Sequence, residues 1–253
     1  MKAKISIYQE GNPVLELNDL INESNSVLIA DFDNDKISFS HNADKPFKSA
    51  SVIKIYVLAY YMYIGAPLDK VYHIDKKQMI GTSVITEQRL TEVRLDYMLK
   101  SMIGMSDNTA TNVLFAEATF EKLNAFIKEV IGTENTVIAR KMLDYKAVEE
   151  GRDNLTSLSD VYKAMKFLWK YDFARECLRS QKCLERIGRY FFDNSITLYL
   201  KSGSIPLVFN DVGILEKGGR HAFAGVLTYG EDKNSKAKRL CGVAGLKAAE
   251  LLK

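Results

Sequence analysis

The sequence predicts an α+β fold, in which an antiparallel sheet built from both ends of the chain is flanked by helices. Strand-like runs rich in β-branched residues occur near both ends, at residues 27–32, 36–40, 195–201, 208–216 and 222–229. Between the two groups, residues 51–189 have helical periodicity. The alternating strand–helix units that form parallel sheets are missing from this order. We therefore expect a helical segment inserted between the two halves of one sheet.

Turn residues and helical spacing complete the predicted order of elements. Asp33-Asn34-Asp35 predicts a hairpin between the first two runs, and Lys217-Gly218-Gly219-Arg220 separates the last two. Apolar residues at helical spacing predict helices at residues 52–63, 95–103, 109–118, 120–131 and 159–171. A final helix at residues 238–252 has small and apolar residues on one face.

This order predicts two lobes that share one core, in a chain near the upper size that a single core supports. We expect an α/β lobe of residues 1–48 and 195–253, arranged as an α/β/α sandwich. An all-helical lobe of residues 49–194 is inserted into it. The active site is expected between the two lobes.

Composition argues against several classes of partner. The 35 basic and 32 acidic residues give a net charge of +3, which is too even to predict nucleic-acid or anionic-membrane binding. The longest apolar region, residues 52–66, is shorter than a bilayer crossing and is interrupted by Lys54, so no membrane span is expected. No apolar stretch of signal-peptide length follows the N-terminus, which predicts a cytoplasmic protein, or a secreted one whose export signal has been removed. We expect a monomer.

The sequence does not favour metal or cofactor chemistry. The cysteines are odd in number without a CxxC pair, and the histidines lack metal-ligand spacing: Cys177, Cys183, Cys241, His41, His73 and His221. Neither a GxGxxG nor a GxxxxGK[ST] phosphate-binding motif occurs. We therefore expect inert, partly buried thiols, no metal and no cofactor.

The first candidate for chemistry is Ser51, with Lys54 three residues later. On a helix two such side chains share a face with Cβ atoms about 5–6 Å apart, so the amine can reach the hydroxyl. Lys54 lies in an apolar run, and its burial would lower its pKa and favour a neutral base. The same spacing recurs at Ser235 and Lys238, in a polar stretch that predicts a surface loop. Alone the motif is weak, because this spacing also arises by chance.

Two further polar clusters each have a structural and a chemical interpretation. Ser106-Asp107-Asn108 precedes a predicted helix, where such residues are preferred N-caps. Facing the Ser51 helix, the same residues would relay a proton and hold a carbonyl group. Lys201-Ser202-Gly203-Ser204 follows the end of a predicted strand, where a β-turn is the simpler interpretation. A lysine, a hydroxyl and a glycine in that place can also bind a carboxylate and admit a ligand closely.

In this order, S-x-x-K, S-D-N and K-S-G resemble the motifs of the class A β-lactamases and related penicillin-interacting serine hydrolases. The resemblance covers about residues 42–230, and residues 47–57 and 210–213 beside the motifs agree with it. It implies a β-lactamase/transpeptidase-like fold and an acyl-enzyme mechanism. It also implies a small-molecule β-lactam or acyl-peptide substrate.

The resemblance implies catalytic roles for three residues and a substrate-binding role for a fourth. Ser51 is similar to the acylated nucleophile, and Lys54 is similar to the base that activates it. Ser106 resembles the hydroxyl that relays a proton to the leaving nitrogen, and Asn108 resembles the amide that contacts the substrate carbonyl.

It also implies a binding role for the third cluster. Lys201 and Ser202, beside Gly203, are similar to the carboxylate-binding residues of the family. The backbone amides of Ser51 and Ser204 would form the oxyanion hole, in which one lost donor typically costs about 10²–10³ in turnover.

The pattern breaks in a loop where that family has an arginine and, two residues on, a glutamate that positions the deacylating water. Here the stretch reads Arg140-Lys141-Met142-Leu143-Asp144, so Met142 stands where the glutamate is expected. A thioether cannot take a proton from water. Arg140 and Asp153 are placed to form the ion pair that closes the loop.

Three outcomes for deacylation stay open: Asp144 is a substitute base, Lys54 does both jobs, or the acyl-enzyme persists. A local hydrogen-bond acceptor is the simpler role for Asp144. We expect β-lactam hydrolysis, slowed because general-base help is worth about 10²–10⁴ in rate. The alternative is a penicillin-binding-type D-Ala-D-Ala peptidase or esterase that β-lactams acylate and that deacylates poorly. A non-catalytic binding module is disfavoured because nucleophile, base, relay and carboxylate clamp are all present.

Overall fold

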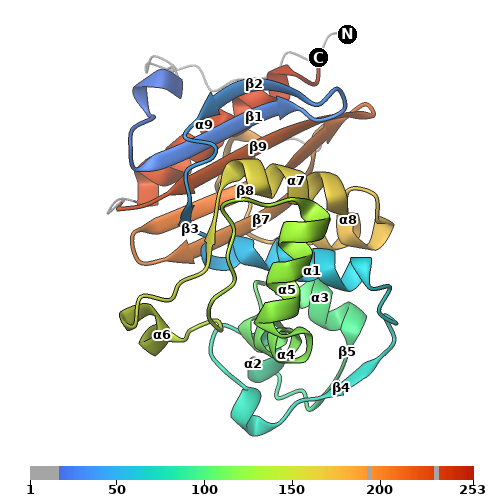
Figure 1. Cartoon of the computed structure of the whole chain (residues 1–253). Helices are drawn as coiled ribbons and strands as arrows, with labels where there is room; N and C mark the ends of the chain where they lie inside the picture. Colours follow the sequence, from blue (N-terminus) through green and yellow to red (C-terminus); the bar gives the residue numbers. More distant parts are fainter. Residues whose placement is uncertain (1–16, 193–194, 231–233) are drawn as a thin grey trace.

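The computed structural model describes residues 17–192, 195–230 and 234–253. Its centre is a five-stranded antiparallel sheet in the order β2-β1-β9-β8-β7 (Figure 1). The strands are β1 (Asn25–Asp31), β2 (Lys36–His41), β7 (Thr197–Ile205), β8 (Val208–Lys217) and β9 (Arg220–Thr228). The predicted α+β fold, with a sheet assembled from both ends of the chain, is confirmed. Residues 1–16 of the predicted α/β lobe lie outside the described residues.

Both faces of the sheet are covered by helices. Successive side chains of β1 point to opposite faces. Val27 and Ile29 join an apolar cluster with α9 (Asn234–Glu250), whereas Leu28 and Ala30 join the cluster that contains α7 (Leu158–Leu168). The middle of β1, residues 27–30, is therefore apolar without alternation, because neither face of the strand meets water there.

The helix α1 (Lys54–Tyr63) is the centre of the helical part. Tyr56, Val57 and Leu58 have no exposed surface. The helices that contact α1 are α3 (Leu95–Gly104), α4 (Asn108–Ala118), α5 (Phe120–Phe126), α7 and α8 (Asp172–Arg179). Because α7 and α8 also contact the sheet, one apolar cluster continues from the sheet into the helices.

Helix bounds agree with the predictions within one residue for α3 and α4. The helix predicted at residues 120–131 changes at Phe126 into a π-helical turn, Ile127–Ile131, which ends at Gly132 with φ +79°. The structure adds short elements that were not predicted: α2 (Val84–Glu87), α6 (Tyr145–Glu149), β3 (Phe47–Lys48) paired with β6 (Leu155–Thr156), and β4 (Val71–His73) paired with β5 (Glu92–Arg94).

Two local predictions are wrong. Ser235 and Lys238 lie in the first turns of α9 and not in a surface loop, because the apolar face of that helix already includes the buried Ala237. The segment 201–204 lies inside β7 and forms no turn, since it pairs with β8 up to Ile205. The chain reverses later, at Leu207, which has φ +64°.

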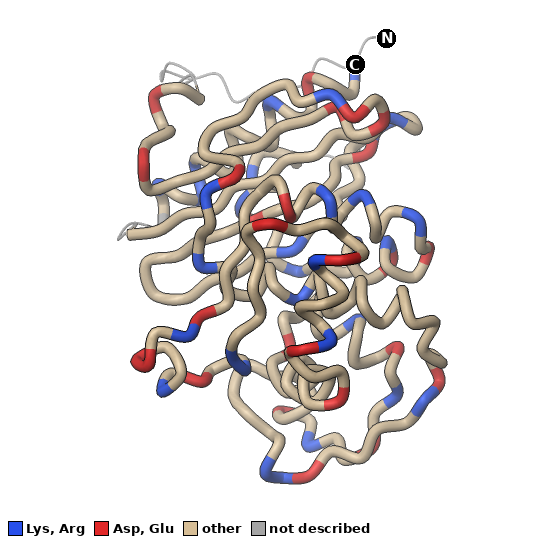
Figure 2. Tube along the Cα trace, in the orientation of Figure 1, with Lys and Arg blue, Asp and Glu red and all other residues tan. Residues whose placement is uncertain are grey.

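Charge is spread evenly over the molecule. Basic and acidic residues are interspersed along the chain (Figure 2). Among the described residues, no helix is both long and apolar enough to span a bilayer.

Candidate active site

Ser51 lies in a 3₁₀ turn, Ala50–Ile53, that leads directly into α1. Val52 and Ile53 are fully buried and anchor this turn, whereas Ser51 stays partly exposed. Ala50 has φ +46°, a left-handed conformation that is uncommon for a residue with a side chain. Backbone strain of this kind persists only where the surrounding structure holds it in place.

Two asparagines hold the chain just before Ser51. Asn210 of β8 donates from Nδ2 to the carbonyl oxygens of Lys48, at 2.8 Å, and of Ser49, at 3.2 Å. The backbone N–H and the hydroxyl of Ser49 both donate to the carbonyl of Asn154, at 2.9 and 3.0 Å. The turn that carries Ser51 is therefore fixed between the sheet and the loop at residue 154.

The strand β7 approaches this turn at Gly203. A Cβ atom there would lie 2.8 Å from the Ser51 nitrogen and 3.0 Å from the Ser49 carbonyl oxygen. Only glycine lets the two backbones come this close. The segments that carry the two predicted oxyanion donors, Ser51 and Ser204, thus lie side by side.

The substitution Gly203→Ala is expected to slow acylation of Ser51 by about 10²-fold, because the added methyl group must displace the turn and small misplacements cost that much. Overpacking is also expected to lower the free energy of unfolding by about 1–3 kcal/mol. Stopped-flow labelling with a fluorescent penicillin and thermal melting measure the two effects. Gly81→Ala is the control, since nothing lies within 4 Å of a Cβ atom there and its φ is not in the left-handed region. Normal labelling of the Gly203→Ala variant would contradict the close approach.

Lys54 is fully buried, and its amine is held by the segment 106–108. Nζ donates to the Ser106 carbonyl at 2.7 Å, to Ser106 Oγ at 3.2 Å and to Asn108 Oδ1 at 2.8 Å. The Ser51 hydroxyl is not among the described groups that hydrogen-bond this amine. Burial, and then the charge of Lys201, hold the pKa of Lys54 well below its ordinary value. The neutral amine that a general base requires is therefore favoured, and in that form Nζ donates only two of these three hydrogen bonds.

Both interpretations of the segment Ser106-Asp107-Asn108 apply, but to different residues: one residue caps a helix, and the other two contact Lys54. Asp107 is the N-cap of α4: its Oδ1 accepts hydrogen bonds from the Ala110 N–H and the Ser83 hydroxyl, both at 2.8 Å. Ser106, with φ +59°, and Asn108 turn their polar atoms toward Lys54 instead. By capping α4, Asp107 thus fixes the backbone from which the side chains of Ser106 and Asn108 reach Lys54.

Lys201 is the second buried lysine. Its Nζ donates to Ser106 Oγ at 3.2 Å and to the Ser202 carbonyl at 2.7 Å. Burial lowers the pKa of Lys201 to about 7, against the opposing charge of Asp211. Ser106 Oγ therefore lies between two lysine nitrogens, one from α1 and one from β7.

This pKa predicts how substrate affinity depends on pH. If Lys201 binds the substrate carboxylate as an ammonium, its affinity for that carboxylate is highest below the pKa of Lys201, about 7, where the amine is protonated. The affinity is lost as the pH rises through this pKa. The KM of a penicillin is then expected to rise above pH 7, by up to about tenfold per pH unit. Steady-state kinetics on the acid and on its uncharged methyl ester measure this, and the ester is expected to show no such rise. A KM of the acid that does not change with pH would contradict the role of Lys201.

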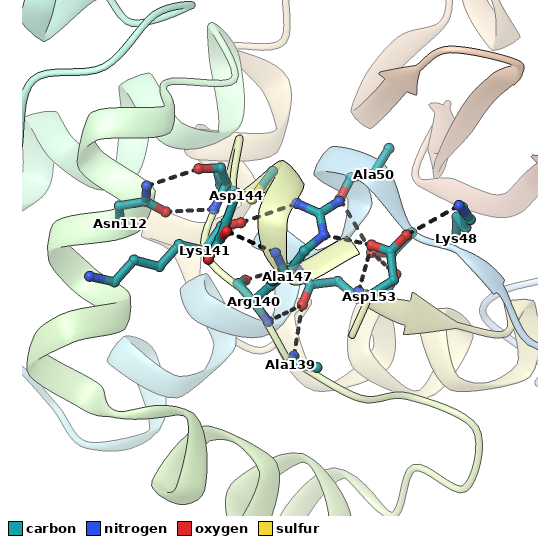
Figure 3. A network of polar contacts seen from close by, with 12 residues as sticks. Lys48, Ala50, Asn112, Ala139, Arg140, Lys141, Asp144, Ala147 and Asp153 are labelled. Atoms are coloured by element: carbon teal, nitrogen blue, oxygen red, sulfur yellow. Dashed lines mark hydrogen bonds and ion pairs between the residues drawn. The ribbon is translucent and has the colours of Figure 1, made fainter. Parts of the chain in front are cut away.

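The loop 140–154 is closed by the predicted ion pair. Arg140 Nε lies 2.7 Å from Asp153 Oδ1, and both side chains are largely buried (Figure 3). Lys48 Nζ lies 3.4 Å from the other carboxylate oxygen of Asp153. Asn154 adds a second clamp, since its Oδ1 accepts the backbone N–H of Arg140 at 3.1 Å and its Nδ2 donates to the Arg140 carbonyl at 3.1 Å.

Met142 is held through its backbone by Asn112 of α4. Asn112 Oδ1 accepts the Met142 N–H at 2.7 Å, and Asn112 Nδ2 donates to the Met142 carbonyl at 3.1 Å. Asn112 lies one helical turn after Asn108 on the same face of α4. The Met142 side chain is 7% exposed and belongs to the apolar core.

Asp144 is the N-cap of α6. Its Oδ1 accepts the backbone N–H of Ala147 at 3.1 Å, as Figure 3 shows. This is the simpler of the two roles that the sequence predicts for the residue.

If capping is its whole role, Asp144→Asn is expected to leave deacylation unchanged, because the amide keeps an acceptor oxygen. Asp144→Ala is expected to lower the free energy of unfolding by about 1 kcal/mol, through loss of the cap. Decay of the acyl-enzyme, followed by intact mass, and thermal melting measure both. Slower deacylation in Asp144→Asn at unchanged stability would make Asp144 the substitute base.

The sequence reasoning missed four polar residues that hold the site: Asn112, Asn154, Arg186 and Asn210. Asn112 had a detectable signal, because it follows Asn108 by four residues on a predicted helix. The other three make contacts with residues distant in the chain and have no local pattern.

Comparisons with known proteins agree with this architecture. The sequence model of a family described as the β-lactamase enzyme family matches residues 13–252. Among solved structures, a β-lactamase from Sphaerobacter thermophilus is 24% identical, with a TM-score of 0.78 and 89% of each chain covered. A β-lactamase from Chitinophaga pinensis is 22% identical, with a TM-score of 0.79 over 94% of this chain and 96% of that one. PBP-A is 18% identical, with a TM-score of 0.77 over 92% and 93%.

At these identities the likeness to solved structures shows the fold. No curated protein matches the chain.

Proposed function

We propose that the chain, which belongs to the β-lactamase enzyme family, opens β-lactam rings through an acyl intermediate on Ser51. The hydroxyl proton of Ser51 passes to the neutral amine of Lys54, and Oγ bonds to the lactam carbonyl carbon. The resulting oxyanion accepts hydrogen bonds from the N–H groups of Ser51 and Ser204. The C–N bond then breaks, and the ring nitrogen takes a proton from Ser106 Oγ, which takes one in turn from the Lys54 ammonium.

The remaining residues bind the substrate. Lys201 as an ammonium and the Ser202 hydroxyl hold the carboxylate of the lactam, and Asn108 donates to the amide carbonyl of its side chain. Water then attacks the ester carbon, the ester bond breaks, and the proton that the water loses goes to Ser51 Oγ.

One observation carries the proposal: Ser106 Oγ lies 3.2 Å from Lys54 Nζ and 3.2 Å from Lys201 Nζ. A hydroxyl between two lysines of lowered pKa can accept a proton on one side and deliver one on the other. This supports a proton path from the nucleophile to the leaving nitrogen.

The apolar Met142 supports slow turnover. It is bound to Asn112, one helical turn after Asn108, and offers water no base, so we expect deacylation to limit the rate. The match to a family of β-lactamases favours lactam hydrolysis over the peptidase alternative.

The test is to mix the protein with nitrocefin and with a fluorescent penicillin, and to follow colour and intact mass. Repeated turnover, with an adduct on Ser51 during the reaction, is expected. A stoichiometric adduct that never decays would favour the acyl-trapping alternative. Neither colour nor adduct would overturn the proposal.

A further inference from the structure

Arg186 is a buried cation directly beneath β7. It lies in the segment between α8 and β7, and its side chain is 4% exposed. Nη1 donates to the carbonyl oxygens of Gly203, at 3.1 Å, and of Asn210, at 2.6 Å, and Nη2 donates to Ser204 Oγ. Among the described residues, no carboxylate lies within ion-pair distance of this guanidinium, the buried Asp211 interacts with it through space, and the buried Nε of Arg186 has no hydrogen-bond partner. A charge buried in this way costs stability, so its contacts need a further explanation.

The contact with Gly203 bears on the predicted oxyanion hole. The Gly203 carbonyl and the Ser204 N–H belong to one peptide group, and in a trans peptide the two point in opposite directions. β7 is the edge strand of the sheet, Gly203 pairs with Asn210 of β8, and Arg186 donates to the carbonyl oxygens of both residues. The strand pairing and Arg186 together hold the Gly203 carbonyl on the side of β8, so the Ser204 N–H is directed out of the edge of the sheet.

The same bond strengthens the donor. A cation that hydrogen-bonds a peptide oxygen draws electron density from the peptide group, so that the N–H becomes a better donor. The second contact acts on the other side of the hole. Arg186 holds the backbone of Asn210, and the Asn210 side chain holds the carbonyls of Lys48 and Ser49 before the Ser51 turn.

We propose that Arg186 is a positioning residue for the oxyanion hole: it orients and polarises the Gly203–Ser204 peptide and links it to the turn that carries Ser51. This inference rests on the proposed acylation of Ser51. This role of Arg186 differs from binding of the substrate carboxylate, because a weaker oxyanion hole slows acylation by every acyl substrate, whether or not the substrate carries a charge.

The experiment compares Arg186→Lys and Arg186→Gln with the unchanged protein. Arg186→Lys keeps the charge and loses the two-pronged donor, and Arg186→Gln keeps two donors and loses the charge. Acylation is measured with penicillin G and with an uncharged acyclic thioester. Both variants are expected to lose about 10- to 10³-fold in the acylation rate constant on both substrates, with KM little changed.

A spectroscopic measurement separates orientation from loss of structure. The infrared stretch of the acyl-enzyme carbonyl, labelled with ¹³C, is expected to move to higher frequency in both variants, because the oxygen accepts weaker hydrogen bonds. Thermal melting reports the folded fraction, and rates are taken only on folded protein. The control is Arg189→Gln, which removes an exposed arginine three residues on and is expected to change neither rate nor frequency.

Slower reaction of penicillin G alone, through KM, would overturn the inference and make Arg186 a carboxylate-binding residue. An unchanged carbonyl frequency in both variants would overturn the inference as well, and would show that Arg186 only stabilises the fold. Failure of the unchanged protein to form any acyl adduct contradicts instead the proposed function.

Discussion

The Ser51→Ala variant is expected to lose covalent labelling by a fluorescent penicillin completely. The variant lacks the only atom that the proposed mechanism acylates, and no rearrangement of Lys54 replaces it. The fold is expected to persist, because the Ser51 side chain is partly exposed and hydrogen-bonds no other described residue. Gel fluorescence and intact mass measure the labelling, and thermal melting measures the fold.

The chain provides a matched control for this variant. Ser235 also precedes a lysine by three residues, but it is exposed at the start of α9. Ser235→Ala is therefore expected to label like the unchanged protein. If Ser51→Ala labels normally and Ser235→Ala does not, the nucleophile has been assigned to the wrong copy of the motif.

The second large effect is a gain. Met142→Glu is expected to speed decay of the acyl-enzyme by about 10²–10⁴-fold, because it places a carboxylate where a general base for water is missing. Asn112 holds the backbone of residue 142 through its N–H and carbonyl, so the substitution leaves the position of the loop unchanged. Burial would raise the pKa of the new carboxylate, which brings a base closer to neutral pH.

The cost of this gain is stability, because Met142 belongs to the apolar core and a carboxylate there loses solvation. Single-turnover decay of the penicillin adduct measures the rate, and thermal melting measures the cost. Leu143→Glu is the control: it adds the same charge one residue on, at a side chain that is 37% exposed, and is expected to leave decay unchanged. Equal acceleration in both variants would show a general effect of charge and not a positioned base.

The pattern of residue types along the chain was sufficient for the fold class and for the choice of candidate residues. Strand-like runs at both ends predicted the sheet, since alternation and β-branched composition are local properties. The three motifs singled out Ser51, Lys54 and Ser106, because their order along the chain resembles that of a known family. The ion pair of Arg140 with Asp153 followed from the resemblance of its loop to the loop of that family.

Local patterns were misleading where pairing across the sheet determined the outcome. Residues 201–204 have a turn-like composition and are nevertheless strand, because β8 pairs with them and the reversal occurs at Leu207. Ser235 and Lys238 are polar and are nevertheless helix, because the neighbouring Ala237 is buried beneath them.

The order of residues along the chain does not show which groups come into contact in the folded protein, or how deeply they are buried. Burial lowers the pKa values of both Lys54 and Lys201, and the charge of Lys201, 147 residues further along the chain, lowers that of Lys54 again. Arg186 has no motif, yet it holds the Gly203 carbonyl and the Asn210 carbonyl together. Residue identity supplied the reactive groups, whereas their protonation and orientation arise from desolvation and short distances that exist only after the chain has folded.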